Sequence, residues 1–176
     1  MDELALNILD IAYNSIRAQA TFIQIHIHDS VKENIISIDI IDNGCGMSKE
    51  QVEKVIDPFY TTRTTRSVGL GIPLFKQNAE LTGGMLEIKS VIGEGTSVKT
   101  KFVKNHIDTP MMGNLIDTIA TLIQANENID YEFIYKNDDI DFKMNTKDMK
   151  SILGDVKINE PEVILWLKDY IKEGLS

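Results

Sequence analysis

Two polar residues near the start of the chain, Asp10 and Asn14, have the types and the spacing to hold a metal ion and a reactive water. Residues 2–19 lack Pro and Gly, and their apolar residues recur at helical spacing, which predicts a helix. Asp10 and Asn14 share one face of it, with Arg17 one turn further along. Magnesium on a triphosphate needs only one or two protein oxygens, and the Asn14 amide can supply one. The alternative interpretation is a pair of solvated helix-surface residues.

A second group of candidate residues follows a predicted strand. Residues 35–41 read Ile-Ile-Ser-Ile-Asp-Ile-Ile, which is typical of a strand buried on at least one face. An adenine site needs an acceptor for the exocyclic amine, and Asp42 can be that acceptor. Gly44 and Gly46 let the backbone approach the ring edge without a Cβ atom, and Met47 can lie against the base. The alternative is an ordinary turn.

A third motif, residues 68–73, reads Val-Gly-Leu-Gly-Ile-Pro and follows a stretch rich in Thr and Arg. It predicts the start of a helix that runs to about residue 81, with Pro in the first turn. The main-chain N–H groups of Gly69, Leu70 and Gly71 would point outward there, where the helix dipole favours phosphate. The motif is neither a Walker sequence nor a dinucleotide fingerprint. A fourth motif, residues 93–96, reads Gly-Glu-Gly-Thr.

In this order and spacing, the motifs resemble those of the GHKL superfamily. Its members share an ATP-binding fold and include gyrase, the ninety-kilodalton chaperone, sensor histidine kinases and the mismatch-repair ATPases. Residues 10–18 resemble the N box, 42–47 the G1 box, 67–72 the G2 box and 95–96 the last glycine motif. Residues 57–63 read Asp-Pro-Phe-Tyr-Thr-Thr-Arg and resemble the F box of histidine kinases, with Arg63 in place of lysine. The resemblance covers residues 1 to about 104.

The resemblance implies a role for each candidate residue, with ATP and Mg²⁺ as cofactors. Asn14 would bind magnesium, Asp42 the adenine amine, and Thr96 the adenine through a water. Gly44 and Gly46 would border the base edge, with Met47 beside it. The main chain of Gly69, Leu70 and Gly71 would contact the phosphates, with Arg17 and Arg63 as candidate phosphate partners. A short lid would run from about residue 61 to residue 68.

The resemblance also implies the fold class. We expect α+β, a two-layer α/β sandwich of the Bergerat type, with a mostly antiparallel sheet and helices on one face. Residues 1–104 would form the GHKL-type ATP-binding domain. Residues 105–176 would form a small α-β-β-α-α extension, packed on the first domain or on a partner. Its predicted elements are a helix over 113–125, strands over 129–135 and 140–145, a short helix from residue 146, and a last helix capped by residues 159–161.

Asp10 departs from the family pattern in a way that bears on catalysis. Hydrolytic members have a glutamate there as the base for the attacking water, whereas many histidine kinases have a non-ionisable residue. Asp10 is one methylene shorter, and a general base must come within roughly 2.6–3.2 Å of its water. We therefore expect slow hydrolysis at most. The alternative is direct phosphotransfer, which relies on positioning and charge neutralisation. Because the sequence starts inside the predicted N-box helix, we expect no phosphoacceptor segment before it, which favours action in trans.

Three functions stay open: a regulatory kinase acting on a separate protein client or response partner, a slow ATPase, and a nonenzymatic nucleotide sensor or assembly factor. The formal net charge of -9 argues against nucleic acid as a partner. No segment reads as a signal peptide or a membrane span, so we expect a cytoplasmic location and no membrane contact. A homodimer is one option. Cys45, the only cysteine, is expected to be inert, and His26 and His28 to lie on a solvated strand face.

Overall fold

The structure is a computed structural model that describes residues 3–59 and 71–176. In chain order its elements are α1 (Leu4–Arg17), β1 (Phe22–Ser30), β2 (Ile35–Asp42), α2 (Lys49–Val55), α4 (Gly71–Leu81), β3 (Met85–Val91), β4 (Gly95–Val103), α5 (Leu115–Ala125), β5 (Asp130–Asn137), β6 (Asp141–Asn145), α6 (Thr146–Leu153) and α7 (Pro161–Gly174). In the described part of the chain, no helix is both long enough and apolar enough to cross a bilayer.

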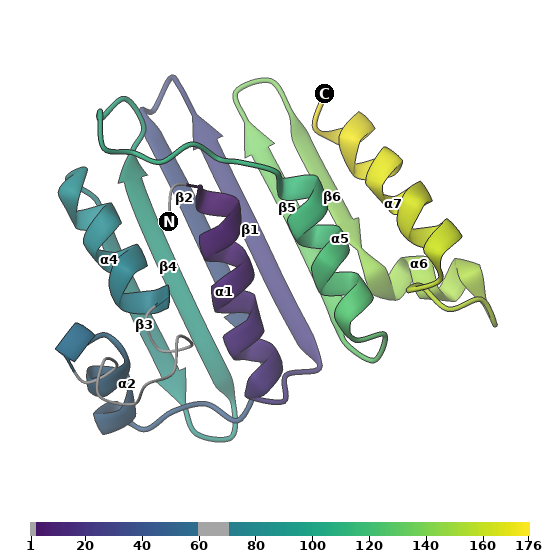
Figure 1. The fold of residues 1–176 in the computed structure, drawn as a ribbon, viewed down its shortest axis with the longest axis horizontal. Helices are drawn as coiled ribbons and strands as arrows, with labels where there is room; N and C mark the ends of the chain where they lie inside the picture. The colour runs from purple at the N-terminus through teal and green to yellow at the C-terminus, as the bar shows by residue number, and fades with distance from the viewer. Residues whose placement is uncertain (1–2, 60–70) are drawn as a thin grey trace.

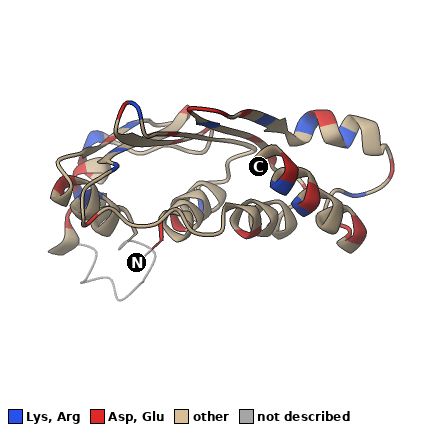
Figure 2. Ribbon diagram, turned by 90° about the horizontal axis from the view of Figure 1, so that it is seen from above, with Lys and Arg blue, Asp and Glu red and all other residues tan. Residues whose placement is uncertain are grey.

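The strands form one six-stranded sheet in the order β3-β4-β2-β1-β5-β6. Every neighbouring pair is antiparallel except β1 and β5, which run parallel. Helices α1, α4, α5 and α7 lie over one face of the sheet and leave the other face open (Figures 1 and 2). The predicted fold class, a two-layer α+β sandwich with a mostly antiparallel sheet, is confirmed.

Alternation of apolar and polar residues decides which face of the sheet the helices cover. In β1, Ile23, Ile25 and Ile27 are almost fully buried, and the residues between them are half-buried. The register pairs Ile25 with Ile40 and Ile27 with Ile38, so isoleucines of both central strands point to the same side. Because side chains alternate between faces with a period of two, this one-sided burial fixes the register of the pair.

Helix α1 packs its apolar stripe onto these isoleucines. Leu4, Ile8 and Ile11 are at most 2% exposed. Ser15 continues the stripe and is buried as well. Since residues three and four apart share one helix face, the stripe points Asn14 toward the end of the sheet where β2 finishes. This packing is what brings the polar residues of α1 to the turn after β2.

The segment after residue 104 joins the same sheet. Strand β5 pairs with β1 along its length, and β6 pairs with β5. Helix α5 packs against α1, and α7 packs against α5, which makes the helix layer continuous (Figure 1). Phe133 and Phe142 belong to the same cluster of buried apolar residues as Leu4 and Ile8.

The open face of the sheet is polar. His26 and His28 both lie there, and each ring is about one-third exposed. His26 Nε2 lies 2.9 Å from Glu132 Oε1 on β5, and His28 Nε2 lies 2.5 Å from Glu33 Oε2. The Glu132 carboxylate also accepts a hydrogen bond from Gln24 at 3.2 Å. These contacts give both histidines structural partners on the sheet surface.

Candidate functional site

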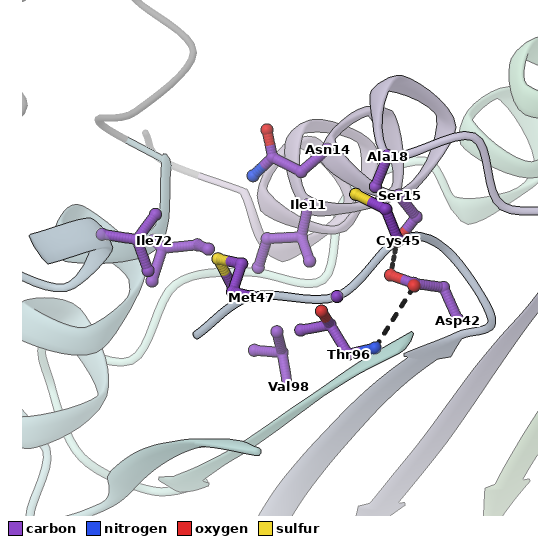
Figure 3. A pocket seen from close by; sticks show the side chains of 12 residues that line it. Ile11, Asn14, Ser15, Ala18, Asp42, Cys45, Met47, Ile72, Thr96 and Val98 are labelled. Atoms are coloured by element: carbon purple, nitrogen blue, oxygen red, sulfur yellow. Dashed lines mark hydrogen bonds between the residues drawn. The ribbon is translucent and has the colours of Figure 1, made fainter. Parts of the chain in front are cut away.

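The Asp42 carboxylate is held in one orientation at the end of β2. Ser15 Oγ on α1 donates to Asp42 Oδ2 at 2.6 Å. The main-chain N–H groups of Gly44 and Thr96 donate to Oδ1 at 2.8 and 3.3 Å. An ionised carboxylate has about four lone-pair positions, so these three donors leave an acceptor position for another partner. Figure 3 shows the Asp42 side chain between Ser15 and Thr96, joined to both.

Two glycines let backbone segments pack directly against each other around Asp42. Gly46 has φ +72°, and a Cβ atom there would lie 2.0 Å from the carbonyl oxygen of Val91. Gly95 has φ +132°, and a Cβ atom there would lie 2.0 Å from the carbonyl oxygen of Asp42. Both positions therefore require glycine, for conformation and for space. The turn after β2 and the β3–β4 hairpin are pressed together as a result.

A cavity of about 220 Å³ opens beside Asp42. Its lining residues come from α1, α2, α4, β4, the end of β2 and the turn after it. Figure 3 shows Asp42 and Thr96 on one side of the cavity and Asn14 on the other. The lining is mostly apolar and consists of Ile11, Asn14, Ser15, Ala18, Asp42, Cys45, Gly46, Met47, Val55, Ile72, Thr96 and Val98. Sites for complete drug-sized ligands measure about 300–1,000 Å³. The cavity therefore has room for a flat ring with one polar edge, and larger substituents would have to lie outside it.

The cavity is lined by most of the residues predicted for the base site. Of the two glycines in the turn, only Gly46 lines it. Asp42, Gly46, Met47 and Thr96 line it directly. Gly44 is buried outside the lining, and a Cβ atom there would lie 2.8 Å from the carbonyl oxygen of Ala18. In this structure Gly44 packs the turn against the end of α1 and supplies an N–H group to Asp42.

Asn14 and Arg17 lie together beside the cavity. Arg17 Nη1 donates to Asn14 Oδ1 at 3.0 Å, and its guanidinium lies 5.9 Å from the centre of the Tyr13 ring. An amide oxygen has two lone pairs, so Asn14 Oδ1 keeps one acceptor position while it is bonded to Arg17. The pair places a neutral amide oxygen next to a positive charge beside the cavity.

Asp10 lies against the first residue of α4. A Cβ atom built on Gly71 would lie 3.3 Å from Asp10 Cβ and 3.7 Å from its Oδ2. Partial burial raises the pKa of the Asp10 carboxyl above its ordinary value, and the charge of Arg17 acts in the opposite direction. The packing of α1 against α4 thus brings Asp10, from the first motif, next to Gly71, from the third.

Several predicted site residues lie outside the described part of the chain. These are Arg63, Gly69 and Leu70, together with the lid over residues 61–68 and most of the F-box and G2-box matches. Their predicted roles stay predictions.

Two serines of the site were not predicted from the sequence. Ser15 positions Asp42, as described above. Ser90 on β3 has Thr96 as its Cα partner in the hairpin, and their hydroxyl oxygens lie 2.8 Å apart. Ser90 Oγ also accepts a hydrogen bond from the Met47 N–H at 2.7 Å. The only sequence signal for Ser15 is its position directly after Asn14, and Ser90 has no local signal.

Cys45 is exposed and lines the cavity. This exposure contradicts the buried environment on which the expectation of an inert thiol rested. The only cysteine of the chain is therefore accessible to a reagent that enters the cavity.

Comparison with known proteins agrees with this geometry. The sequence model of the family described as "Histidine kinase-, DNA gyrase B-, and HSP90-like ATPase" matches residues 1–106. The chain belongs to this family, as its motifs predicted. Membership in this family supports ATP binding.

Similar proteins include bacterial sensor kinases. The signal transduction histidine-protein kinase ArlS of Staphylococcus epidermidis is 29% identical over 57% of this chain and 23% of its own length. The sensor protein kinase WalK of Staphylococcus haemolyticus is 33% identical over 43% of this chain and 13% of its own length. The chain thus spans less than a quarter of either relative. The Aquifex aeolicus MutL ATPase domain, solved with ADP, is 16% identical with a TM-score of 0.49, covering 82% of this chain and 64% of that one.

Proposed function

We propose that this protein binds Mg-ATP and acts in trans on a separate protein, as a regulatory kinase or a slow ATPase of the histidine kinase-like type. One observation carries the proposal. A carboxylate held by Ser15, Gly44 and Thr96 borders an apolar cavity that opens toward Asn14. An adenine ring in that cavity would donate its exocyclic N–H to Asp42. The triphosphate would extend past Asn14 and Arg17.

The donor set fits magnesium in the form in which it accompanies a nucleotide. Mg²⁺ keeps several waters and takes one or two protein oxygens together with phosphate oxygens. Asn14 Oδ1, with its remaining lone pair, is the protein ligand that we propose. The bound ion would neutralise part of the triphosphate charge. Arg17 would add a second positive charge on the same side of the cavity.

Asp10 is the residue that we propose for proton transfer. Because its pKa is raised, the Asp10 carboxylate accepts a proton more readily than an ordinary aspartate does, which suits a general base. Gly71 at the start of α4 lies beside it, so a phosphate bound at that helix start would be close to Asp10. The shorter side chain favours slow hydrolysis, with direct phosphotransfer as the alternative.

Action on a separate protein and a cytoplasmic location are further parts of the proposal. The relatives ArlS and WalK are histidine kinases or sensor kinases by name, and this chain covers only 23% and 13% of their length. A second candidate function is a nonenzymatic nucleotide-sensing assembly factor. It is favoured by the length of chain beyond residue 106, which the family match does not cover.

Calorimetric titration with ATP tests the binding step. Wild-type protein should bind ATP with magnesium and bind it far more weakly with EDTA. Asn14→Ala should lose the magnesium-dependent part of the affinity. Asn43→Ala is unsuitable as a control because Asn43 Oδ1 accepts the N–H groups of Thr21 and Phe22. Asn128→Ala, in an exposed turn distant in the chain from the cavity, is the matched control. Normal magnesium-dependent affinity in Asn14→Ala would overturn the metal assignment.

Incubation with labelled ATP and magnesium tests the reaction. Phosphate release without transfer selects the ATPase, and transfer of label to a co-purifying protein selects the kinase. Binding with neither outcome selects the sensor.

A further inference from the structure

One face of the last helix carries aromatic and acidic side chains together. Glu162, Trp166, Asp169, Tyr170 and Glu173 follow one another at intervals of four, three, one and three residues along α7. Positions three and four apart share a helix face, so these five residues form a single stripe, here called the acidic aromatic stripe. The opposite side of α7 buries Ile164, Leu167 and Ile171 against the core, which leaves the stripe facing outward.

The aromatic residues of the stripe are preorganised yet open to solvent. Trp166 is 52% exposed and Tyr170 is 37% exposed. Their rings are stacked, with centroids 5.3 Å apart and planes at 19°. The Tyr170 ring also rests on Phe142 of β6, with centroids 5.6 Å apart. Because Tyr170 rests on Phe142 and Trp166 is stacked on Tyr170, a ligand that bound to the pair would lose little side-chain entropy.

The carboxylates of the stripe are available. Within residues 3–59 and 71–176, the side chains of Glu162, Asp169 and Glu173 form no hydrogen bond and no ion pair. The one ion pair of α7 in that part of the chain involves Lys168, which bonds Asp117 on α5 at 3.4 Å, away from the stripe. The stripe therefore combines negative charge with exposed π surface and contains no basic residue. Figure 2 shows acidic positions along the helix next to the C-terminus.

The charge of the whole chain is concentrated at this end. Of the formal net charge of -9, residues 105–176 contribute -7, because they contain 14 acidic and seven basic residues. Residues 1–104 contribute only -2. A surface with this field repels a second copy of the chain and attracts a basic partner.

We propose that the acidic aromatic stripe is the docking surface for a protein segment that presents arginine. A guanidinium can stack on the Trp166 or Tyr170 ring and reach a carboxylate one helical turn away, and its planar donors match a carboxylate bidentately. Lysine offers a point charge without the planar donor pair. The inference rests on the proposed function in one respect, because a protein that acts in trans needs a surface that binds its client. The stripe adds that the client presents arginine.

The stripe and the cavity lie at different ends of the helix layer. Helix α7 packs on α5, and α5 packs on α1, whose Asn14 and Ser15 line the cavity (Figure 1). A docked segment and a nucleotide would therefore not compete for space. The two sites can be tested independently in the same sample.

Trp166 is the only tryptophan of the chain, so tryptophan emission, excited at a wavelength that tyrosine does not absorb, reports on the stripe alone. The probes are three synthetic helical peptides of equal length, identical except for Arg, Lys or Glu at the exposed positions. The Arg peptide should shift and change the Trp166 emission in a saturable way, the Lys peptide should bind more weakly, and the Glu peptide should have no effect. Equal effects of the three peptides, or none, would overturn the proposal.

Charge-neutral variants test the carboxylates. Glu162→Gln and Glu173→Gln should each weaken Arg-peptide binding about tenfold, as expected for the loss of one charge-assisted hydrogen bond. Asp155→Asn removes the same charge outside the stripe and should leave the affinity within about twofold, because a single distant charge is largely screened. Equal weakening by all three variants would mean nonspecific attraction and would overturn the proposal.

A truncation of the aromatic ring needs a control for folding. Trp166→Ala, followed by calorimetry because fluorescence is lost, should abolish tight binding while its melting temperature stays near that of the wild type. If the variant is destabilised, Tyr170→Phe with Glu173→Gln provides a test that keeps the ring stack. A concentration-dependent emission shift without peptide, together with a dimer in sedimentation, would assign the stripe to a second copy and overturn the proposal.

The same titrations with Asn14→Ala separate this inference from the proposed function. If the wild-type protein binds the Arg peptide but no ATP, the docking proposal holds and the proposed nucleotide function is wrong. ATP binding by a protein that ignores the Arg peptide would do the reverse.

Discussion

The Ser15 hydroxyl donates a 2.6 Å hydrogen bond to Asp42 Oδ2. It joins the residue next to Asn14 on α1 to the carboxylate that we propose for base recognition. The two ends of the proposed nucleotide site are therefore connected by one short contact across the helix and sheet layers. A substitution at either residue should therefore change the position of the other side chain.

Ser15→Ala should weaken ATP binding about tenfold, because Asp42 would lose one of its three hydrogen-bond donors and the orientation that it imposes. Ser37→Ala, on the open face of β2, removes a hydroxyl of the same size far from the cavity and is the control. Calorimetric titration of both variants gives the comparison. Unchanged affinity in a folded Ser15→Ala protein would show that the contact does not position the base acceptor.

Asp42→Asn should change which base the cavity prefers. Gly44 and Thr96 donate to one oxygen of the side chain, so an amide would keep its oxygen there and turn its NH₂ group toward Ser15 and the base. Two donors would then face each other where the adenine amine binds. ATP affinity should fall by about a hundredfold or more, and the preference for ATP over GTP should shrink. A variant that binds ATP as tightly as the wild type would remove Asp42 from the base site.

Substitutions at Asp10 separate hydrolysis from binding. A general base contributes about a hundredfold or more, so Asp10→Asn should lower any phosphate release by that factor and leave ATP affinity close to normal. Asp10→Glu restores the methylene that Asp10 lacks and should raise the rate. Phosphate release is the measurement. Undiminished hydrolysis by Asp10→Asn would mean that another group activates the water.

The raised pKa of Asp10 gives these variants a pH signature. The carboxyl binds a proton more readily in the folded than in the unfolded chain, so its ionised form lowers stability above the folded pKa. Below both pKa values the effect disappears. Asp10→Asn should therefore melt slightly above the wild type at pH 7, and the difference should vanish as the pH falls below the ordinary value of 3.8. A difference that grows on acidification would contradict the shift.

Cys45 offers a direct assay of cavity occupation. The thiol is exposed and lines the cavity, so a maleimide should label it in the free protein. Saturating Mg-ATP should slow the labelling, and GTP at the same concentration should slow it less. Mass spectrometry follows the reaction without interference because the chain has no other cysteine. Equal labelling rates with and without ATP would argue that the nucleotide binds elsewhere.

Removal of residues 105–176 tests whether residues 1–104 are an independent domain. Strand β1 has β2 on one side and β5 on the other, so the truncation would expose an unpaired strand edge and the buried side of α1. Exposed edges promote association between chains. The fragment should elute as aggregates and unfold with a shallow urea transition. A monomeric fragment with a sharp transition would establish a separate domain.

Local patterns predicted the elements that have a strong apolar period. The predicted helix over residues 2–19 is Leu4–Arg17, and the predicted strand over 35–41 is Ile35–Asp42. Helix α2 was not predicted because it is only seven residues long, and its two apolar residues, Val52 and Val55, are too few to establish a helical period. The helix begins with a capping box, in which the side chains of Ser48 and Gln51 each bond the other's main-chain N–H group. A Ser followed three residues later by Gln is a sequence signal that could have predicted this helix start.

Contacts between distant segments could not be predicted in the same way. The pairing of β1 with β5 joins residues that are more than a hundred positions apart, and no local pattern records it. The site divides along the same line. Asn14 and Asp42 could be proposed from residue type and spacing. The hydrogen bond from Ser15 to Asp42 could not, because it depends on how α1 packs on the sheet.

The close contacts of Gly46 and Gly95 with main-chain carbonyls have a consequence for how the protein can change. Gly46 lines the cavity and Gly95 does not, but at both positions a Cβ atom would meet a main-chain carbonyl oxygen, so no residue with a side chain could replace either glycine. Gly93, in the same hairpin, has open space around it, and Asn can adopt its left-handed conformation. In a randomised library selected for nucleotide affinity, positions 46 and 95 should stay glycine while position 93 accepts other residues. The glycines would therefore restrict the evolution of this site more strongly than its charged residues do.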